Sequence, residues 1–353
     1  MFGERDYMSF KNLFRKKYIN SLFTTPSHSQ KYCLVNKFKH FYKCDISETD
    51  THNPQKYLDD AEEFASQIYG TNQTVFLTNG STSGVISAVL ACVRAGVNVL
   101  IWRESHICHK NGVELAGGNP IYYDIPICSD WGIPQKVTVE LIEPYLIKNK
   151  IKAVIVTSPS YYGIVSDIKE LKMLCEKYGA YLIVDEAHGA LYPFSDRLPE
   201  SAVKYADVVI QSLHKTVGGL NPTALIHSNL DFDIKPFVNK ILTTSPSYPL
   251  LSTIEANISF LNSTRGRKKI DNLINSILKL RDECQNIDFG GDDITKILIK
   301  KNGLSGYELS DILYNQYHIE DEITNDKSTM LLCGIGTTDK KLKKLSESLK
   351  RIV

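Results

Sequence analysis

The sequence predicts an α/β protein in which a mostly parallel sheet is covered by helices on both faces, followed by a small α+β C-terminal domain. Short, nearly continuous apolar segments alternate with amphipathic segments through the middle of the chain. Strands of this kind are typical of parallel sheets whose two faces are both buried. The chain has 353 residues, more than a single core usually holds. Because the composition turns polar and basic at 263–269, we place a domain boundary there.

The predicted organisation is an N-terminal arm (1–55), a large domain (56–265) and a small C-terminal domain (266–353). The predicted strands are the short apolar segments at 74–78, 97–102, 120–123, 153–157, 181–185, 207–211 and 223–227. The predicted helices have apolar residues at helical spacing and lie at 83–94, 107–116, 139–148, 168–178, 270–284 and 340–352. A further amphipathic helix is expected near the N-terminus, with Phe10, Leu13, Phe14 and Ile19 as its apolar positions.

Composition argues against several classes of partner. Lys+Arg number 41 and Asp+Glu 40, so the net charge is +1, and nothing in this balance indicates a nucleic acid or a membrane as partner. No apolar segment approaches the roughly 20 residues that span a bilayer, and none resembles a signal peptide. The 8 cysteines are scattered, which favours free thiols and a cytoplasmic location. His106, Cys108 and His109 lack a second ligand pair, so no metal site is predicted.

Polar residues follow five of the predicted strands. They lie at 79–83, 103–106, 158–161, 185–188 and 212–215. In open sheets of parallel strands, ligands bind at the carboxyl ends of the strands. The five segments therefore indicate one binding site at that edge of the sheet.

Two residues at strand ends suggest a particular cofactor. A lysine forms Schiff bases when its surroundings lower its pKa, and Lys215 follows a strand in the company of Ser212 and His214. Asp185 ends an earlier strand, where its carboxylate would keep a pyridine nitrogen protonated and make the ring an electron sink. Together they predict a pyridoxal-phosphate (PLP) site, whereas Lys215 by itself would be read as a surface charge.

Two further segments fit this cofactor but also have simpler readings. Residues 79–83 (NGSTS) lie between a strand and a helix, where backbone N–H groups and hydroxyls could hold a phosphate. An ordinary helix cap is the alternative. The imidazole of His106 could stack on a cofactor ring, or it could be a buried structural histidine.

Taken together, the motifs resemble the Orn/Lys/Arg decarboxylases, which are PLP enzymes of fold type I. The strongest similarity lies at 157–165 (TSPSYYGIV), 184–190 (VDEAHGA) and 206–216 (ADVVIQSLHKT). Weaker similarity extends to 25–28 (TPSH), 45–54 (DISETDTHNP), 243–251 (TTSPSYPLL), 292–297 (DDITKI) and 306–322. The chain departs from the family's usual residues at Ser27, 103–108 (RESHIC) and 220–223 (LNPT). It reads as a short form without the N-terminal wing domain of the large members.

The resemblance implies a role for each matching position. Lys215 would form the Schiff base with PLP, Asp185 would pair with the pyridine nitrogen, and His106 would stack on the ring; these three are the predicted catalytic residues. Ser245 would reach the phosphate in a neighbouring subunit, which implies a homodimer with shared active sites. The other positions expected to contact the cofactor are Ser81, Thr82, Ser158, Ala187, His188, Ser212 and His214.

The implied reaction is decarboxylation of a basic amino acid: arginine, lysine, ornithine or a modified relative. Aminotransferases of this fold type anchor the substrate carboxylate with an arginine of the C-terminal domain, but from residue 268 onward only Arg281 and Arg351 occur, both in predicted helices. Glu322 aligns best with the acidic position expected to bind the distal cation of the substrate. The alternatives to Glu322 are Glu320, Asp321 and Asp292, or a solvated acidic loop without a binding role.

Two rival functions stay open from the sequence. One is a different PLP-dependent reaction on a similar substrate, such as transamination, elimination or cyclisation. The other is a catalytically inactive protein of the same fold that acts as a regulator.

Overall fold

The computed structural model describes residues 9–18, 39–47 and 53–352. Its centre is a seven-stranded sheet in the order β1-β9-β8-β7-β6-β2-β3. The strands are β1 (Gln73–Leu77), β2 (Asn98–Trp102), β3 (Asn119–Tyr123), β6 (Ile151–Thr157), β7 (Tyr181–Asp185), β8 (Val208–Ser212) and β9 (Ala224–Ser228). Strand β9 is antiparallel to both of its neighbours, while β3, β2, β6, β7 and β8 are parallel. The predicted mostly parallel sheet is confirmed.

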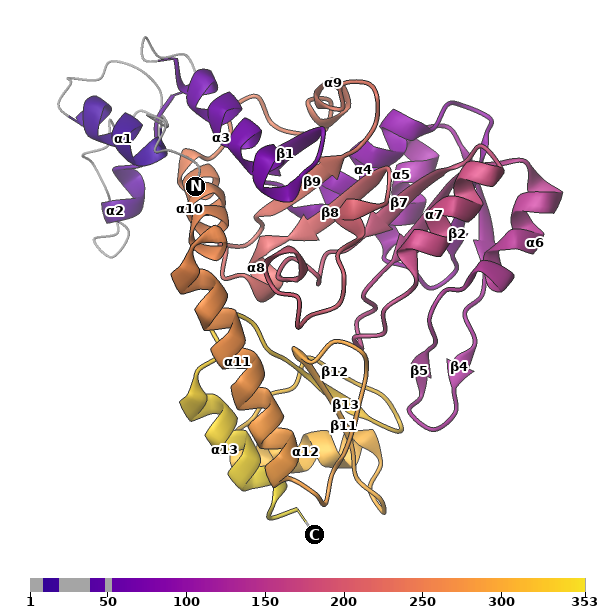
Figure 1. Cartoon of the computed structure of the whole chain (residues 1–353), viewed down its shortest axis with the longest axis vertical. Coiled ribbons are helices and arrows are strands. Elements are labelled where there is room, and N and C mark those ends of the chain that lie inside the picture. The colour runs from indigo at the N-terminus through magenta and orange to yellow at the C-terminus, as the bar shows by residue number, and fades with distance from the viewer. Residues whose placement is uncertain (1–8, 19–38, 48–52, 353) are drawn as a thin grey trace.

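Helices cover both faces of this sheet (Figure 1). Successive residues of a strand point to opposite faces, and in β6 Ala153 and Ile155 enter one apolar core while Val154 and Val156 enter the other. The first core includes residues of α4 (Gly80–Cys92), α5 (Ile107–Leu115) and α9 (Lys235–Val238). The second includes residues of α3 (Pro54–Tyr69), α6 (Val139–Asn149), α7 (Ile168–Lys177) and α10 (Tyr248–Asn262). Burial on both faces explains why the strands are apolar throughout.

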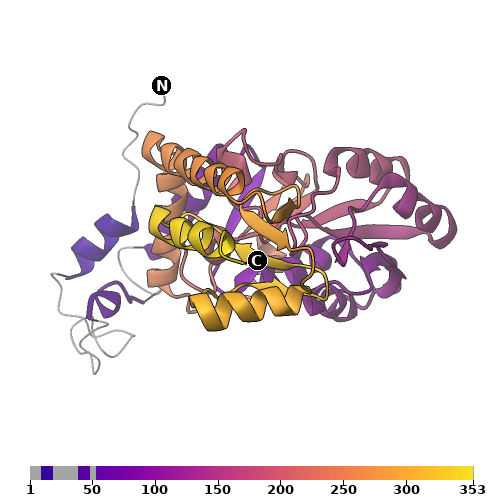
Figure 2. The ribbon, with the colours of Figure 1, turned by 90° about the horizontal axis from the view of Figure 1, so that it is seen from below.

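The C-terminal part has its own sheet and its own core. Four antiparallel strands lie in the order β10-β11-β13-β12. They are β10 (Asp288–Gly290), β11 (Lys296–Lys300), β12 (Ile323–Thr324) and β13 (Thr329–Leu332), accompanied by α11 (Thr264–Glu283), α12 (Gly306–Tyr317) and α13 (Asp339–Leu349). Figure 2, a view from below, shows α11 and α13 side by side, and residues of both helices enter the same apolar core. A small α+β unit was expected here, and the structure has helices packed on a sheet; the exact domain limits stay a prediction.

A hairpin links the large sheet to the C-terminal sheet (Figure 1). It consists of β4 (Ile127–Cys128) and β5 (Ile133–Pro134), which pair antiparallel. Ile133 packs against Leu298 and Met330 of the C-terminal sheet in a small separate cluster. The hairpin therefore fixes one wall of the space between the two sheets.

The N-terminal helix α1 (Phe10–Tyr18) has the expected apolar face, with Phe10 and Leu13 buried. A short helix, α2 (Lys39–Tyr42), follows. Ile19, Ser27 and the similarity at 25–28 lie outside the described residues, as does part of 45–54. None of the described helices has both the length and the apolar character needed to cross a bilayer.

The segment at 263–269, where we place the domain boundary, forms the beginning of a helix. Ser263 caps α11, with its hydroxyl oxygen 3.1 Å from the backbone nitrogen of Gly266. The basic residues after Ser263 therefore form the exposed side of the first turns of α11, and the helix begins earlier than the predicted 270–284.

Candidate active site

A cavity opens at the carboxyl ends of the parallel strands, where the sequence predicted a site. Its volume is about 320 Å³. Six of the predicted residues line it: Ser81, His106, Asp185, Ala187, His188 and Lys215. The remaining lining comes mainly from aromatic and aliphatic side chains, including Trp102, Tyr123, Tyr161, Tyr162 and Ile323. The walls thus come from the large sheet, the hairpin and the C-terminal sheet together.

Lys215 lies in the single turn α8 (Leu213–Thr216), directly after β8. Its amine Nζ is 3.0 Å from Nε2 of His188 and 5.5 Å from the centre of the Tyr161 ring. Burial lowers the pKa of Lys215, although the carboxylates of Asp185 and Glu322 act in the opposite direction. A lysine with a lowered pKa offers more of the neutral amine, which is the form that attacks an aldehyde.

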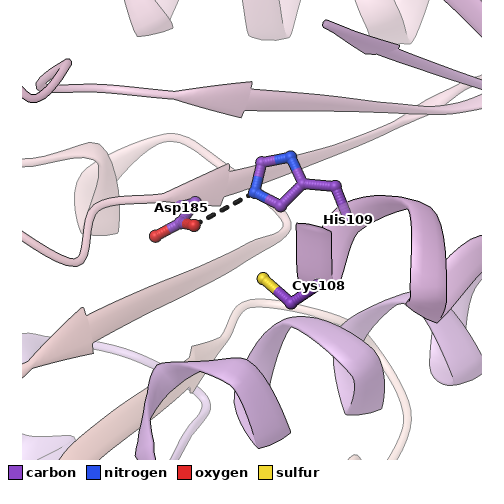
Figure 3. Close-up of side chains that lie close together, drawn as sticks. All are labelled: Cys108, His109 and Asp185. Atoms are coloured by element: carbon purple, nitrogen blue, oxygen red, sulfur yellow. Dashed lines mark hydrogen bonds and ion pairs between the residues drawn. The ribbon is translucent and has the colours of Figure 1, made fainter. Parts of the chain in front are cut away.

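Asp185 is buried and ionised because His109 holds it. Its Oδ2 lies 3.0 Å from Nε2 of His109 (Figure 3). Its Oδ1 accepts the backbone N–H of Ala187 at 3.1 Å. Burial acts to raise the pKa of Asp185, but the hydrogen bond and charge of His109, then Lys215 and Ala187, outweigh it and the pKa is lowered. A buried carboxylate that stays charged is what a protonated pyridine nitrogen requires as a partner.

Cys108, His109 and Asp185 also place ligand atoms within 4.8 Å of one another (Figure 3). Metal-binding thiols are deprotonated, whereas burial and Asp185 raise the pKa of Cys108. The His109–Asp185 hydrogen bond accounts for two of the three groups without an ion. This cluster is therefore better explained as the support of the Asp185 carboxylate than as a metal site.

His106 stands at the start of α5, facing the same cavity. Its Nδ1 accepts the backbone N–H of Cys108 at 3.3 Å and lies 2.9 Å from the Cys108 sulfur. Burial lowers the pKa of His106, which favours the neutral form of the ring. These contacts fix the imidazole at the cavity wall, as a stacking residue requires; that role remains a prediction.

The phosphate end of the predicted site has unsatisfied polar groups, which is the observation that tests whether PLP fits. Helix α4 begins at Gly80, and the side chain of Asn79 makes no capping hydrogen bond to it. The simple helix-cap reading of 79–83 is thus not supported by Asn79. Ser212 Oγ is buried and has no hydrogen-bond partner among the described residues. The Gly80 N–H donates to the carbonyl oxygen of Pro222 at 2.7 Å, but Asn79 does not cap the amides that follow it. A helix N-terminus without this side-chain cap and an unpaired buried hydroxyl are suited to phosphate oxygens, so the residues present fit the cofactor.

Other predicted residues have roles within the fold or lie away from the cavity. Ser158 is buried, and its hydroxyl accepts the backbone N–H of Ser166 at 3.1 Å. His214 Nδ1 lies 3.0 Å from the carbonyl oxygen of Thr223. Thr82 stands in the first turn of α4 but does not line the cavity. Ser245 lies in the loop before α10 and does not line the cavity of its own chain.

The acidic candidates for binding the substrate separate clearly. Glu322 is exposed and directly precedes β12. Its charge contributes to the raised pKa of Tyr161 and opposes the lowering of the pKa of Lys215. Asp321 accepts hydrogen bonds from Ser310, Thr324 and Thr329, so it is occupied by the fold. Asp292 accepts the backbone N–H of Val165 at 2.9 Å. Of these three, Glu322 has the freest carboxylate.

Three residues near Lys215 were not assigned roles from the sequence. His109 supports Asp185, Tyr161 faces both Lys215 and His188, and Lys296 lies 2.9 Å from Nδ1 of His188. Tyr161 and Lys296 belong to motifs that were recognised, but their chemistry depends on contacts between distant segments. The His-x-x-His spacing of His106 and His109 was visible, and it was interpreted only as a metal motif.

Solved structures with a similar overall fold identify the fold of this chain. Lysine decarboxylase A from Pseudomonas aeruginosa has a TM-score of 0.84 at 18% identity, covering 96% of this chain and 59% of that one. An alanine–glyoxylate aminotransferase from Nostoc sp. has a TM-score of 0.65 at 11% identity, covering 87% and 89%. Identities this low show the fold alone, and this fold is that of the fold-type-I PLP enzymes.

Sequence comparison gives the family. Residues 20–299 match the family described as "Orn/Lys/Arg decarboxylase, major domain", and the chain belongs to this family. The uncharacterized protein YaaO of Bacillus subtilis (strain 168) is 29% identical over 308 residues, covering 81% of this chain and 63% of YaaO. An arginine decarboxylase of Halalkalibacterium halodurans is 26% identical over 325 residues, covering 86% and 66%. The chain thus spans about two thirds of the length of these relatives.

Proposed function

We propose that this chain is a PLP-dependent decarboxylase of a basic amino acid, with arginine as the first candidate. The observation that carries the proposal is the pairing of Lys215 with the buried, ionised Asp185 across one cavity at the strand ends. Family membership and the arginine decarboxylase relatives support the reaction and the substrate class. PLP, when bound, supplies an electron sink for the pair of electrons left by the departing carboxylate.

Each residue of the cavity has a task in this proposal. The Lys215 amine holds the cofactor and then moves a proton. Asp185, supported by His109, keeps the pyridine nitrogen protonated. His106 covers one face of the ring, and Ser81 and the start of α4 bind the phosphate together with Ser212, a buried residue at the end of β8 that does not line the cavity. The apolar residues of the wall, such as Tyr123 and Ile125, exclude water and favour loss of a charged carboxylate.

A basic substrate fits the charges at the mouth of the cavity. Glu322 is exposed next to Ile323, which lines the cavity, and no described residue makes a hydrogen bond to its carboxylate; Glu104 lines the cavity itself. A guanidinium or ammonium group carried by the substrate would pair with one of these carboxylates. No described arginine lines the cavity to hold the α-carboxylate in place, which suits a reaction in which that carboxylate leaves.

The test is to incubate PLP-loaded protein separately with arginine, lysine and ornithine and to identify the products by mass spectrometry. The proposal expects one of the three to yield the amine that lacks CO2, and none to do so in the Lys215→Ala variant. A product that keeps its carboxylate would replace decarboxylation by transamination, elimination or cyclisation. Protein that binds no PLP would instead favour the inactive regulator.

We further propose that two chains form a homodimer in which Ser245 of one contacts the phosphate site of the other. The location of Ser245 outside its own cavity supports this. Sedimentation velocity of wild type and of Ser245→Ala, combined with PLP titration, would test it. The proposal would be contradicted by a wild-type protein that is monomeric and binds PLP as tightly as Ser245→Ala does.

A further inference from the structure

A fully buried lysine of the C-terminal sheet lies behind the candidate site. Lys296 is the first residue of β11, and no part of it reaches solvent. Its amine Nζ is 2.9 Å from Nδ1 of His188, and Nε2 of the same ring is 3.0 Å from Nζ of Lys215. One imidazole therefore connects the amine that lines the cavity to a second amine that does not.

The hydrogen bonds limit how many protons these three groups can carry. An ammonium group only donates, and a neutral imidazole has one N–H and one accepting nitrogen. If both lysines were ammonium groups, both nitrogens of His188 would have to accept, which a neutral ring cannot do. If His188 were a cation, both amines would have to be neutral. With both hydrogen bonds formed, the three groups therefore share one extra proton at most.

The packing around Lys296 keeps it where it is. Gly163 has a φ of +83°, and a Cβ atom at this position would lie 3.0 Å from Cδ of Lys296. Asp293 does not take the amine as its hydrogen-bond partner, because its carboxylate accepts from the hydroxyl of Tyr192 at 2.8 Å and from Thr295. Within the described part of the chain, His188 is thus the hydrogen-bond partner of the Lys296 amine.

The charged groups nearby favour neutral forms. Burial lowers the pKa of Lys296 to about 8, with Lys215 acting in the same direction and Asp293, Glu322 and Cys333 opposing it. Burial, Lys296, Lys215 and His214 lower the pKa of His188 well below its ordinary value. The titratable groups that act on Lys215 itself are the following: His188, Asp185, Glu322, Cys108, Tyr161 and His106. His188 is consequently the neutral carrier between two amines that compete for one proton.

Building on the proposed function, we propose that Lys296 is a positioning residue that controls the proton on Lys215 through the ring of His188. With the proton on Lys296, the Lys215 amine stays neutral and can attack an aldehyde carbon. In the reverse direction, Lys296 passes a proton to Nδ1 of His188 while the proton on Nε2 passes to Lys215. The ring ends neutral with its N–H on the other nitrogen, Lys296 becomes a neutral amine, and Lys215 becomes an ammonium group that can act as an acid.

The decisive experiment measures the titration of Lys215 in the full chain freed of PLP. Acetic anhydride labels neutral amines, and peptide mass spectrometry gives the labelled fraction of Lys215 as a function of pH. In Lys296→Met the ring can accept a proton from a Lys215 ammonium group, so the labelling midpoint should rise by about one pH unit or more, a tenfold loss of reactivity at fixed pH. The matched control is Lys300→Met, on the same strand but paired with Asp130, which should leave the midpoint unchanged.

A second variant tests the route through the ring. His188→Phe keeps an aromatic ring beside Tyr161 but removes both ring nitrogens. It should raise the Lys215 midpoint as Lys296→Met does, and the double variant should shift it no further than the single variants. A wild-type midpoint in folded Lys296→Met overturns the proposal, and so does full additivity in the double variant. If Lys296→Met does not fold, an unchanged midpoint in His188→Phe overturns it.

The outcomes separate this inference from the proposed function. A shifted midpoint in protein that decarboxylates none of the three basic amino acids supports the coupling of the lysines and contradicts the function. If the protein decarboxylates a basic amino acid but the Lys215 midpoint is unshifted in Lys296→Met, the function is supported and the coupling of the lysines is contradicted.

Discussion

Asp185 and Glu186 are adjacent in the sequence and both buried, yet the fold shifts the pKa values of their carboxyl groups in opposite directions. Asp185 faces the cavity, where His109 and Lys215 overcome the effect of burial and lower its pKa. Glu186 faces the other way, and burial raises its pKa to about 7 although Ser201, the Ala202 N–H and Gln211 donate hydrogen bonds to it. One strand end thus presents a carboxyl group with a lowered pKa to the site and one with a raised pKa to the core.

The difference shows that the partner and not the depth of burial decides the charge. Asp185 has basic partners, and Glu186 has only neutral donors. The neutral donors around Glu186 also favour its ionised form, but they do not outweigh the effect of burial, whereas the basic partners of Asp185 do. Only Asp185 can therefore serve as a permanent counter-charge for a protonated cofactor ring.

The largest expected effect comes from removing the charge of Asp185. Asp185→Asn keeps the size of the side chain but not its charge, so we expect kcat with the preferred basic amino acid to fall about 100- to 1000-fold. Steady-state kinetics at saturating PLP measures this. Glu186→Gln is the matched control one residue away and should stay within about twofold of wild type. If kcat fell equally in Asp185→Asn and Glu186→Gln, the two carboxyl groups would not differ in their importance for the reaction.

A smaller effect is expected from removing the support of Asp185. In His109→Asn the carboxylate loses its main basic partner, so its pKa should rise and kcat should fall about tenfold. Asp185 must be ionised to act, and its pKa is lowered in the wild type. The acidic limb of the pH–rate profile should therefore move to higher pH in the variant. A lower rate with an unmoved acidic limb would assign His109 a purely structural role.

The titration of Glu186 should change the free energy of unfolding and leave kcat unchanged. Its pKa is raised from 4.5 to about 7, so the folded state binds the proton more tightly than the unfolded chain. This contribution is fully present below about pH 4.5 and is lost as the pH rises through about 7, a change of about 3 kcal/mol. Urea unfolding at several pH values should show that the free energy of unfolding of the wild type falls as the pH rises. In Glu186→Gln this dependence on pH should be weaker. An identical slope in both proteins would mean that Glu186 is ionised when folded.

The smallest effect is expected at an exposed carboxylate. Glu322 is solvent-exposed, so an ion pair with the substrate is worth at most about 1 kcal/mol. Glu322→Gln should raise KM about fivefold and leave kcat nearly unchanged. Asp326→Asn, at an exposed position four residues later, is the control and should change neither constant. A change confined to kcat in Glu322→Gln would argue against a role in substrate binding.

The sequence predicted the elements of the large sheet well because its strands are buried on both faces and interrupted by amphipathic helices. It also predicted that Lys215 and Asp185 share a site, since both follow strands that end at one edge. It predicted a helix from 270, whereas α11 begins at Thr264, because the polar and basic residues of its first turns indicated a domain boundary. The antiparallel direction of β9 was not predicted, since the pattern of apolar residues does not encode strand direction.

The support of the site was harder to predict because it comes from residues far apart in the sequence. His109 reaches Asp185 across 76 positions, and Lys296 reaches His188 across 108. Neither contact has a local signal, since a buried lysine and a helical histidine look ordinary in the sequence. The charge states of Asp185 and Glu186 likewise follow from partners that only the fold brings together.

The most direct test of the account is to find which lysine carries PLP. Protein loaded with PLP would be reduced with borohydride, which fixes the Schiff base, and then digested for peptide mass spectrometry. The account predicts the pyridoxyl group on Lys215 and its loss in Lys215→Ala. A label on Lys296 or on a surface lysine, or no label at all, would contradict the assignment of the site.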